Sequence, residues 1–487
     1  MSKHTHTPLP LTPLKKTRRL LWSLTSCISL LGCSSTLSPY GIAPNPEWEA
    51  EFLIDANFSG LSTTGLYIPP ETDTGDIPDH TFLRTEGLQT HPDELDRFLD
   101  QVAREGGQYL SDLNNLKTNA DGAVGAQWPY NLQPGIWENR SGNCVPAGFE
   151  QEEQYFIRNA STDIWAMALA GYLLDEEQYF ANAKMRLLEF TTLDFPDDRH
   201  NGSNQCALDL GSAAAHLFES AWLMESAGYA DWTTTDKQTL AEWGVTEVIP
   251  VTSFGIEKRK NNWGVVMWAS TLAAANYAAG PYPEITLYDK SIVDTRAFLD
   301  TSGEVLQAWL SNSDTTPLDS QCDRDGEVFG LQPHGGFPDE LRRTGGTLNC
   351  AQESIDFACS SPSSCSGAFS YQQKATNGLA RVCEIFRRMD GNGARCFDLA
   401  IHGGDNPSLF DAIQFAIGGD VTTPEFPVLD HSQGMKFVAG QYYQNGCLIA
   451  LEDDENGSYV RGGRDYAYTR ITHAPGVAYA GTIDSCN

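Results

Sequence analysis

Three basic residues lead directly into Asn261 and Asn262 in the segment KRKNNWG, residues 258–264. This cationic, amide-rich stretch stands out because the chain carries a formal net charge of −32 at pH 7. An apolar stretch follows, and either asparagine is a suitable N-cap for a helix there. Backbone N–H groups at a helix start also attract anions, and an asparagine side chain can donate a hydrogen bond to a carboxylate. The segment therefore predicts a simple helix cap or a site for an anionic group.

Two later segments carry further groups that could move protons or bind anions. GLQPHGGFPDELRRTGG, residues 330–346, contains His334 and the tandem Arg342 and Arg343. GAFSYQQKATNGLARVCEIFRR places Tyr371 at the head of a predicted helix. Taken alone, a tandem arginine on a first helical turn is usually a solvated face, and a lone tyrosine at a helix start is usually a packing residue. The three segments are more informative as an ordered set.

Together NNWG (261–264), GGFPDELRRT (335–344) and SYQQKATNGLARVCEI (370–385) resemble the alginate lyase domain of uronate-cleaving polysaccharide lyases. The resemblance covers roughly residues 150–420. It implies that Asn262 and Arg343 neutralise a substrate carboxylate and that Tyr371 is the catalytic tyrosine. It also implies an anionic polysaccharide as partner, with substrate-binding roles for the neighbouring residues Lys260, Asn261, Trp263 and Arg342.

Two departures from the family pattern affect the expected mechanism. Trp263 stands where the family usually has a histidine. Arg343 and Tyr371 are separated by a cysteine-rich insert with Cys350, Cys359 and Cys365, which we expect to be held by disulfides at the rim of a cleft.

The implied reaction is β-elimination, which removes the proton at C5 of a uronate and expels the glycosidic oxygen at C4. Neutralising the carboxylate stabilises the enolate-like transition state, and a tyrosine can act as base and then acid. In mannuronate and glucuronate the proton and the leaving oxygen lie on the same face, so Tyr371 alone would suffice. In guluronate they lie on opposite faces, and His334 is the candidate second group. The chemistry requires no cofactor.

The N-terminal 33 residues have the features of an export signal. A basic, acid-free start precedes the apolar run LLWSLTSCISLLG, which is too short to span a bilayer. The run ends at LLGCSS, which is typical of a bacterial lipobox with Cys33 as the lipidated residue; an ordinary signal cleaved nearby is the alternative. We therefore expect an exported lipoprotein, periplasmic or anchored to the outer membrane, with lipid as its membrane contact.

Ten cysteines follow Cys33, and an even number in an oxidising compartment predicts disulfides. No two cysteines have CxxC spacing, so no zinc or other metal site is expected. The acidic balance argues against nucleic-acid binding. We expect a monomer.

Helical periodicity dominates from about residue 90. The expected helices include DELDRFLDQVAREGGQYLSDL, a pair across an acidic turn in residues 161–193, CALDLGSAAAHLFESAWLMESAG ending at Gly228, and TTTDKQTLAEWGVTEVIP with a Thr or Asp cap. Repeated paired helices rich in Ala and Gly predict a mainly α fold, an incomplete α/α toroid over residues 76–420. A tether (34–75) would precede it, and a C-terminal segment (421–487) with a β-hairpin in LIALEDDENGSYVRGG would pack on it.

Two other functions use the same scaffold. A glycoside hydrolase would need two inward carboxylates, for which Asp163, Glu219 and Glu340 are available without a distinguished pair. A non-catalytic glycan-binding protein would use Trp128, Trp137, Trp263 and Trp268 as sugar platforms. His216, in AAAHLFESAW, is interpreted as a packed helix residue.

Overall fold

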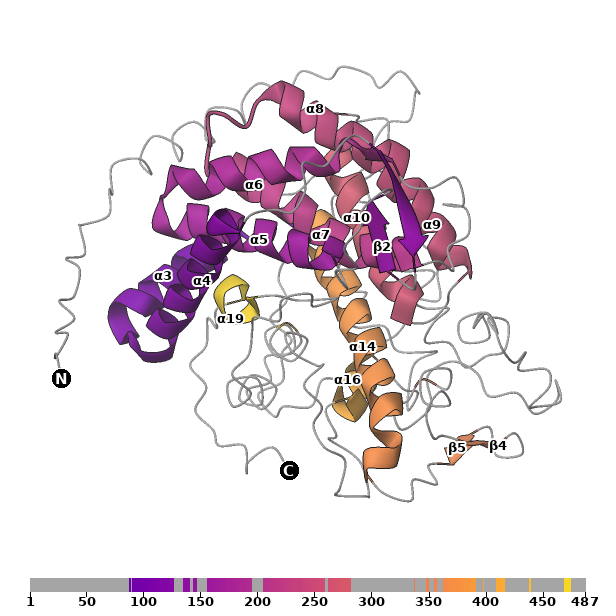
Figure 1. Cartoon of the computed structure of the whole chain (residues 1–487). Coiled ribbons are helices and arrows are strands. Elements are labelled where there is room, and N and C mark those ends of the chain that lie inside the picture. The colour runs from indigo at the N-terminus through magenta and orange to yellow at the C-terminus, as the bar shows by residue number, and fades with distance from the viewer. Residues whose placement is uncertain are drawn as a thin grey trace, which may run out of the picture. The chain divides into compact units, whose positions relative to one another are not determined.

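Helices account for most of the chain that the computed structural model describes (Figure 1). The described residues all belong to one unit, Ser62–Asn487. They are residues 87–88, 90–126, 135–140, 143–146, 156–194, 205–258, 262–281, 337, 347–349, 354–356, 362–390, 397, 409–416, 438 and 468–473. The predicted leader, tether and C-terminal hairpin lie outside these residues.

The first described helices form a pair, α3 (Pro92–Glu105) and α4 (Gly107–Gly125). The sequence predicted one helix across this region, and that prediction was wrong at Gly106 and Gly107. Both glycines have positive φ, 62° and 52°, a conformation that ends a right-handed helix and that glycine adopts without strain. The helix therefore stops and restarts between them.

The next three helices follow the sequence pattern. The predicted pair is confirmed as α5 (Phe156–Leu174) and α6 (Glu177–Phe190). Helix α7 (Gln205–Ser226) ends where Gly228 takes a φ of 65°. The Tyr229 amide then donates to the Met224 carbonyl at 3.0 Å, and the Gly228 amide donates to the Glu225 carbonyl. This Schellman-type ending confirms Gly228 as the stop signal.

A long helical stretch follows as α8 (Thr234–Trp243), the π-helical turn η2 (Gly244–Val248) and α9 (Ile249–Lys258). The predicted threonine cap of α8 is confirmed at Thr233, and its side chain pairs reciprocally with Asp236 in a capping box. The wider turn of η2 comes just before Pro250, which lacks an N–H and would clash within a regular α-helix. Helix α10 (Asn262–Ala278) then begins.

The later helices are α14 (Pro362–Asp390), α16 (Leu409–Ala416) and α19 (Thr469–Thr472). The short α19 contacts α3 and α4. Arg470 donates to Asp112 of α4 at 2.5 Å, with both side chains buried. Asn119 of α4 donates to the Tyr468 hydroxyl at 3.1 Å. These bonds attach residues near the C-terminal end to the first helices of the unit.

Short strands accompany the helices. β1 (Gly135–Arg140) pairs antiparallel with β2 (Asn143–Pro146) and parallel with β3 (Leu193–Asp194). In the cysteine-rich insert, β4 (Thr347–Asn349) pairs antiparallel with β5 (Ser354–Asp356). The sequence reading placed strands only in the C-terminal region and did not find these five. A disulfide joins Cys144 of β2 to Cys206 of α7, and Cys383 of α14 is also disulfide-bonded, which confirms the oxidised state predicted for these cysteines.

Alternate helices form a buried inner layer. In chain order, α5 packs on α7, α7 on α10, and α10 on α14, while α6 packs on α5 and α9 packs on α10 (Figure 1). Nearly every residue of α7 and α10 is buried, down to small polar ones. The mainly α fold is confirmed, with the alternation of inner and outer helices that an incomplete α/α toroid requires.

The inner helices run parallel to one another. Arg158, near the start of α5, forms a buried ion pair with Asp209, near the start of α7. One to two turns farther along, Trp165 stacks on His216 with ring centroids 6.1 Å apart. Contacts between α7 and α10 also proceed from the start of both helices toward their ends. Gly211 meets Met267 near the starts of the helices, and Tyr277 donates to Glu225 at 2.8 Å near their ends.

Helix α14 continues this direction. Gly378 lies against Val265 of α10, and a Cβ at Gly378 would come within 2.8 Å of the Val265 side chain. Farther along α14, Arg381 lies close enough to His216 of α7 to lower its pKa. The starts of α5, α7 and α10 therefore gather at one end of the inner layer, on the side from which α14 enters.

The close approach of α7 and α10 at Gly211 gives a first prediction. A Cβ there would lie 2.7 Å from the Met267 side chain and 3.1 Å from its backbone Cα. Gly211→Ala should therefore lower the free energy of unfolding by about 1–3 kcal/mol through overpacking.

Gly122→Ala is the matched control, because nothing lies within 4 Å of a Cβ at this position of α4. It should stabilise the protein by up to about 1 kcal/mol, since alanine favours a helix over glycine. Denaturant unfolding measures both changes. Equal effects of the two substitutions would contradict the packing described for α7 and α10.

Candidate functional site

Asn262 is the first residue of α10, and its side chain is 1% exposed. The helix start predicted from NNWG is confirmed. Because Asn262 lies inside the helix, the capping position falls at residue 261, outside the described residues. Trp263 is partly exposed next to it. The amide side chain of Asn262 thus lies in the first turn of α10, among backbone N–H groups that have no partner within the helix.

Tyr371 lies within α14 and not at its head. The helix begins at Pro362, so the predicted start was wrong by more than two turns. The residues PSSCSGA were assigned to the cysteine-rich insert, yet they belong to α14, and Pro362 suits a first helical turn. Tyr371 and Gly378 are seven residues apart and therefore share one face of α14. Gly378 contacts α10, so this is the face directed toward α10.

The second motif reaches α14 beside this tyrosine. The buried backbone amide of Phe337, in GGFPDELRRT, donates to the Gln372 side-chain oxygen at 2.7 Å. Phe337 is itself buried in the hydrophobic core. Gln372 immediately follows Tyr371, so the hydrogen bond holds Phe337 one position along α14 from the tyrosine. Sequence reasoning did not single out Gln372.

Residues of three segments that are far apart in the chain therefore lie toward the same end of the α10–α14 pair. Asn262 and Val265 are three residues apart on α10, and Tyr371 and Gly378 are seven apart on α14. Since Val265 touches Gly378 and the helices run parallel, Asn262 and Tyr371 lie on the same side of this contact. Of the predicted site residues, the structure describes Asn262, Trp263 and Tyr371. The predictions for Cys33, Lys260, Asn261, His334, Arg342 and Arg343 fall outside the described residues.

The stretch of α14 around Tyr371 is accessible at two points. Between residues 371 and 385 every side chain is buried except Tyr371 and Lys374, which are partly exposed. The Lys374 ammonium nitrogen lies 5.0 Å from the centroid of the Tyr371 ring. An accessible phenol with an adjacent cation can exchange a proton with an anionic ligand and hold that ligand. Sequence reasoning missed Lys374, although the i, i+3 spacing predicts that the two side chains meet on a helix.

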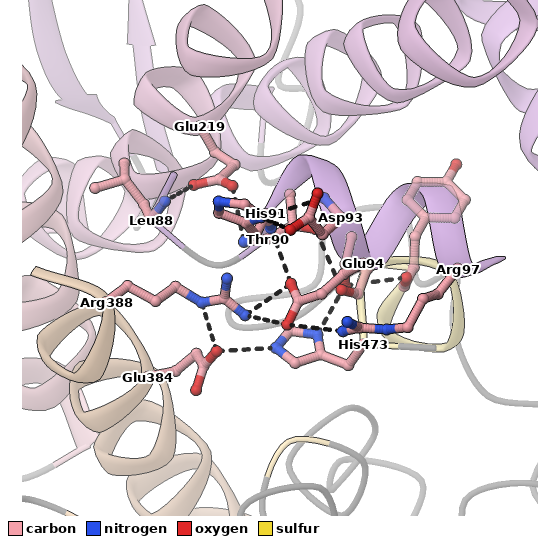
Figure 2. A network of polar contacts seen from close by, with 12 residues as sticks. Leu88, Thr90, His91, Asp93, Glu94, Arg97, Glu219, Glu384, Arg388 and His473 are labelled. Carbon is pink, nitrogen blue, oxygen red and sulfur yellow. Dashed lines mark hydrogen bonds and ion pairs between the residues drawn. The ribbon is translucent and has the colours of Figure 1, made fainter. Parts of the chain in front are cut away.

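A second cluster of polar side chains is structural. Figure 2 shows Arg388 of α14 between two carboxylates. Its terminal nitrogen donates to both Glu94 oxygens at 2.8 Å, and its Nε donates to Glu384 at 2.6 Å. His473 lies 3.4 Å from the same Glu384 oxygen. Burial alone would raise the pKa of Glu94, but Arg388 and His473 lower it overall. This network joins α3, α14 and the residue after α19.

Glu219 of α7 lies beside this network and binds backbone. Its two carboxylate oxygens accept from the amides of Leu88 and Thr90, each at 3.0 Å (Figure 2). The side chain is fully buried. Glu219 thus anchors the segment that leads into α3, which is a structural role and not that of a hydrolase acid. Of the other carboxylates that a hydrolase could use, Asp163 is buried on α5 and Glu340 is outside the described residues.

The tryptophans offer little to a glycan-binding surface. Trp268 is 2% exposed and belongs to the hydrophobic core, so it cannot act as a sugar platform. Trp263 is partly exposed and packs against that core. Trp137 lies on β1, and Trp128 is outside the described residues. Trp263 is the one partly exposed tryptophan among those whose side-chain burial the structure describes.

His216 is a packed residue, as predicted. It is 1% exposed and stacks on Trp165. Neither ring nitrogen has a hydrogen-bond partner among the described residues. Burial, and secondarily the charge of Arg381, lower the pKa of His216 well below its usual value of 6.5. The imidazole is therefore neutral in the folded protein at neutral pH.

This buried histidine predicts a pH dependence of stability. Below about pH 6.5 the unfolded chain takes up a proton at residue 216 that the folded protein does not, so acid favours unfolding. This destabilisation of the folded protein is absent above that pH, and below it the free energy of unfolding falls by up to about 1.4 kcal/mol per pH unit. His216→Phe preserves the ring stacking and removes the titration.

Chemical denaturation between pH 5 and 7.5 measures the effect. The free energy of unfolding of His216→Phe should fall less steeply with acid than that of the wild type, and the two curves should be parallel above pH 7. Parallel curves over the whole range would show that His216 is protonated equally in both states.

The described residues contain no group of three or more His, Cys, Asp or Glu side chains arranged to hold a metal ion. No helix in this part of the chain combines the length and apolar character needed to cross a membrane.

Comparison with known proteins gives distant structural similarity only. No family model matches the sequence, and no curated protein matches it. Among solved structures, the crystal structure of an alginate lyase from Bacteroides ovatus is similar, with 14% sequence identity and a TM-score of 0.49. The alignment covers 80% of this chain and 99% of that one. A similarity at this level assigns neither fold nor activity, so both must rest on the residues themselves.

Proposed function

We propose that the chain is a polysaccharide lyase that cleaves a uronate-containing polysaccharide, either polymannuronate-rich alginate or a glucuronan-like chain, by β-elimination. The supporting observation is the convergence of three motifs on one end of the α10–α14 pair. Asn262 lies in the first turn of α10, Phe337 is bonded to Gln372, and Tyr371 is one of two accessible side chains on its part of α14.

The substrate carboxylate would be held at the start of α10. In this proposal the Asn262 amide donates to it, and Arg343, six residues after the anchored Phe337, supplies a positive charge. The first-turn N–H groups of α10 add to the favourable field, because a helix N-terminus carries a partial positive charge. With the carboxylate neutralised, negative charge can spread from C5 into the carboxyl group during proton removal. Such electrostatic stabilisation contributes several kcal/mol in other enzymes.

Tyr371 would carry out the proton transfers. Its phenolate removes the C5 proton, the electron pair forms the C4–C5 double bond, and the C4–O bond breaks. The phenol then gives its proton to the departing glycosidic oxygen. One side chain can serve both steps only where the proton and the leaving oxygen lie on the same face, as in mannuronate and glucuronate. Trp263 in place of the family histidine agrees with this syn course. His334 is the group we assign to any activity on guluronate.

The remaining features of the proposal follow from the sequence. The protein would be exported and tethered by lipid at Cys33, and it would act as a monomer on an extended anionic chain. Lys260, Asn261, Trp263 and Arg342 would line the binding site around Asn262 and Arg343. The proton transfers use side chains of this protein alone.

Replacing the proposed base tests the function directly. Tyr371→Phe should lower kcat on polymannuronate or glucuronan by at least about 100-fold, because general acid–base catalysis contributes about 10²–10⁴. The ring stays in place, so binding of the polysaccharide should persist. Ultraviolet absorbance of the unsaturated product measures the rate.

Tyr229→Phe is the control, because it removes a phenol that stacks on Phe180 away from the motifs. Its activity should equal that of the wild type. Full activity of Tyr371→Phe would show that another group removes the proton.

A further inference from the structure

The exposure pattern of α14 singles out Lys374 as a partner of Tyr371. These two are the only partly exposed side chains between residues 371 and 385, and both belong to a helix that is otherwise buried there. A ligand that reaches Tyr371 from solvent can therefore also meet Lys374. Its ammonium nitrogen lies 5.0 Å from the ring centroid, a distance typical of a cation–π contact.

Lys374 also lies on the face directed toward α10. Tyr371, Lys374 and Gly378 are spaced by three and four residues, so they form one stripe along α14. Gly378, the last of the three, packs on Val265 of α10. Lys374 lies between this contact and Tyr371, on the side where Asn262 begins α10. The cation therefore belongs to the same end of the helix pair as the proposed catalytic groups.

A positive charge at this point matters because the protein as a whole repels an anionic ligand. The chain has 64 acidic and 32 basic residues other than histidine. A polyuronate carries a carboxylate on every sugar, so the sugar next to the one being cleaved brings a second negative charge to the site. Asn262 and Arg343 are assigned to the first carboxylate and are not needed for the second.

We propose that Lys374 binds the carboxylate of the uronate adjacent to the cleaved one and thereby selects polyuronates over neutral glycans. The inference rests on the proposed function for its substrate class. The ammonium would contact the second carboxylate while its stem stays against the Tyr371 ring. Lys374 thus binds the ground state and the transition state alike, and its loss should raise KM while leaving kcat nearly unchanged.

Another lysine supplies a matched control. Lys117 of α4 lies 5.7 Å from the centroid of the Tyr179 ring, so it forms the same kind of lysine–tyrosine pair. Its nitrogen is bonded to Asp121 at 2.9 Å and to the Tyr179 hydroxyl at 2.9 Å. Lys117→Gln therefore removes a comparable pair on α4 and α6, away from the three motifs.

The test uses direct binding in the Tyr371→Phe background, where the ring remains and cleavage is suppressed. Calorimetry with a saturated mannuronate oligosaccharide, and separately with a glucuronate oligosaccharide, gives Kd. Adding Lys374→Gln should raise Kd about 10-fold, equivalent to about 1.4 kcal/mol, and should weaken the dependence of Kd on salt. Adding Lys374→Arg should keep Kd within about threefold, and adding Lys117→Gln should leave it unchanged.

With Tyr371 intact, Lys374→Gln should raise KM about 10-fold and keep kcat within about twofold. An unchanged Kd and salt dependence in Lys374→Gln would overturn the assignment, even if the wild type cleaves polyuronates. If the wild type cleaves no polyuronate but its binding still depends on Lys374, the lyase proposal fails and the carboxylate site stands.

Discussion

The close, parallel packing of the inner helices is the constraint on which the site depends. Gly211 lets α7 approach the backbone of α10, and Gly378 lets α14 approach Val265. Ser270 of α10 reinforces the first contact, donating to the Gly211 carbonyl at 2.6 Å and accepting from the Ala215 amide at 3.2 Å. Larger side chains would separate the helices. Because the helices are parallel, this packing fixes Asn262 and Tyr371 at one end of the layer.

The proposed function also requires this acidic chain to bind an anion. Several charges among the described residues are paired within the fold, as in the pair of Arg158 with Asp209 and the contacts of Arg388 with Glu94 and Glu384. Such pairs hold the helices and the terminal segments together. Near Tyr371 the inner layer has the start of α10 with Asn262, and the partly exposed Lys374. In the proposed function these groups meet the ligand.

The sequence predicted the helices well where local signals agreed. Thr233 with Asp236 and Gly228 marked helix ends correctly, because caps and positive φ are local properties. It failed where glycine and serine can either interrupt a helix or lie within one. Gly106 and Gly107 ended a helix that the periodic pattern continued, whereas PSSCSGA belongs to α14. The bond between Phe337 and Gln372, the network of Glu94 with Arg388, and the exposure of Lys374 depend on tertiary contacts. No local pattern encodes which distant helix will lie opposite a residue, so these had to come from the structure.

The most direct test of the account is the action of the purified mature protein on four polymers: polymannuronate, glucuronan, polyguluronate and a neutral glucan. The account predicts unsaturated product from polymannuronate or glucuronan, none from the neutral glucan, and little from polyguluronate, because Tyr371 can serve only a syn elimination. Cleavage confined to polyguluronate would contradict the single-tyrosine mechanism. Absence of product from every polyuronate would contradict the lyase assignment itself.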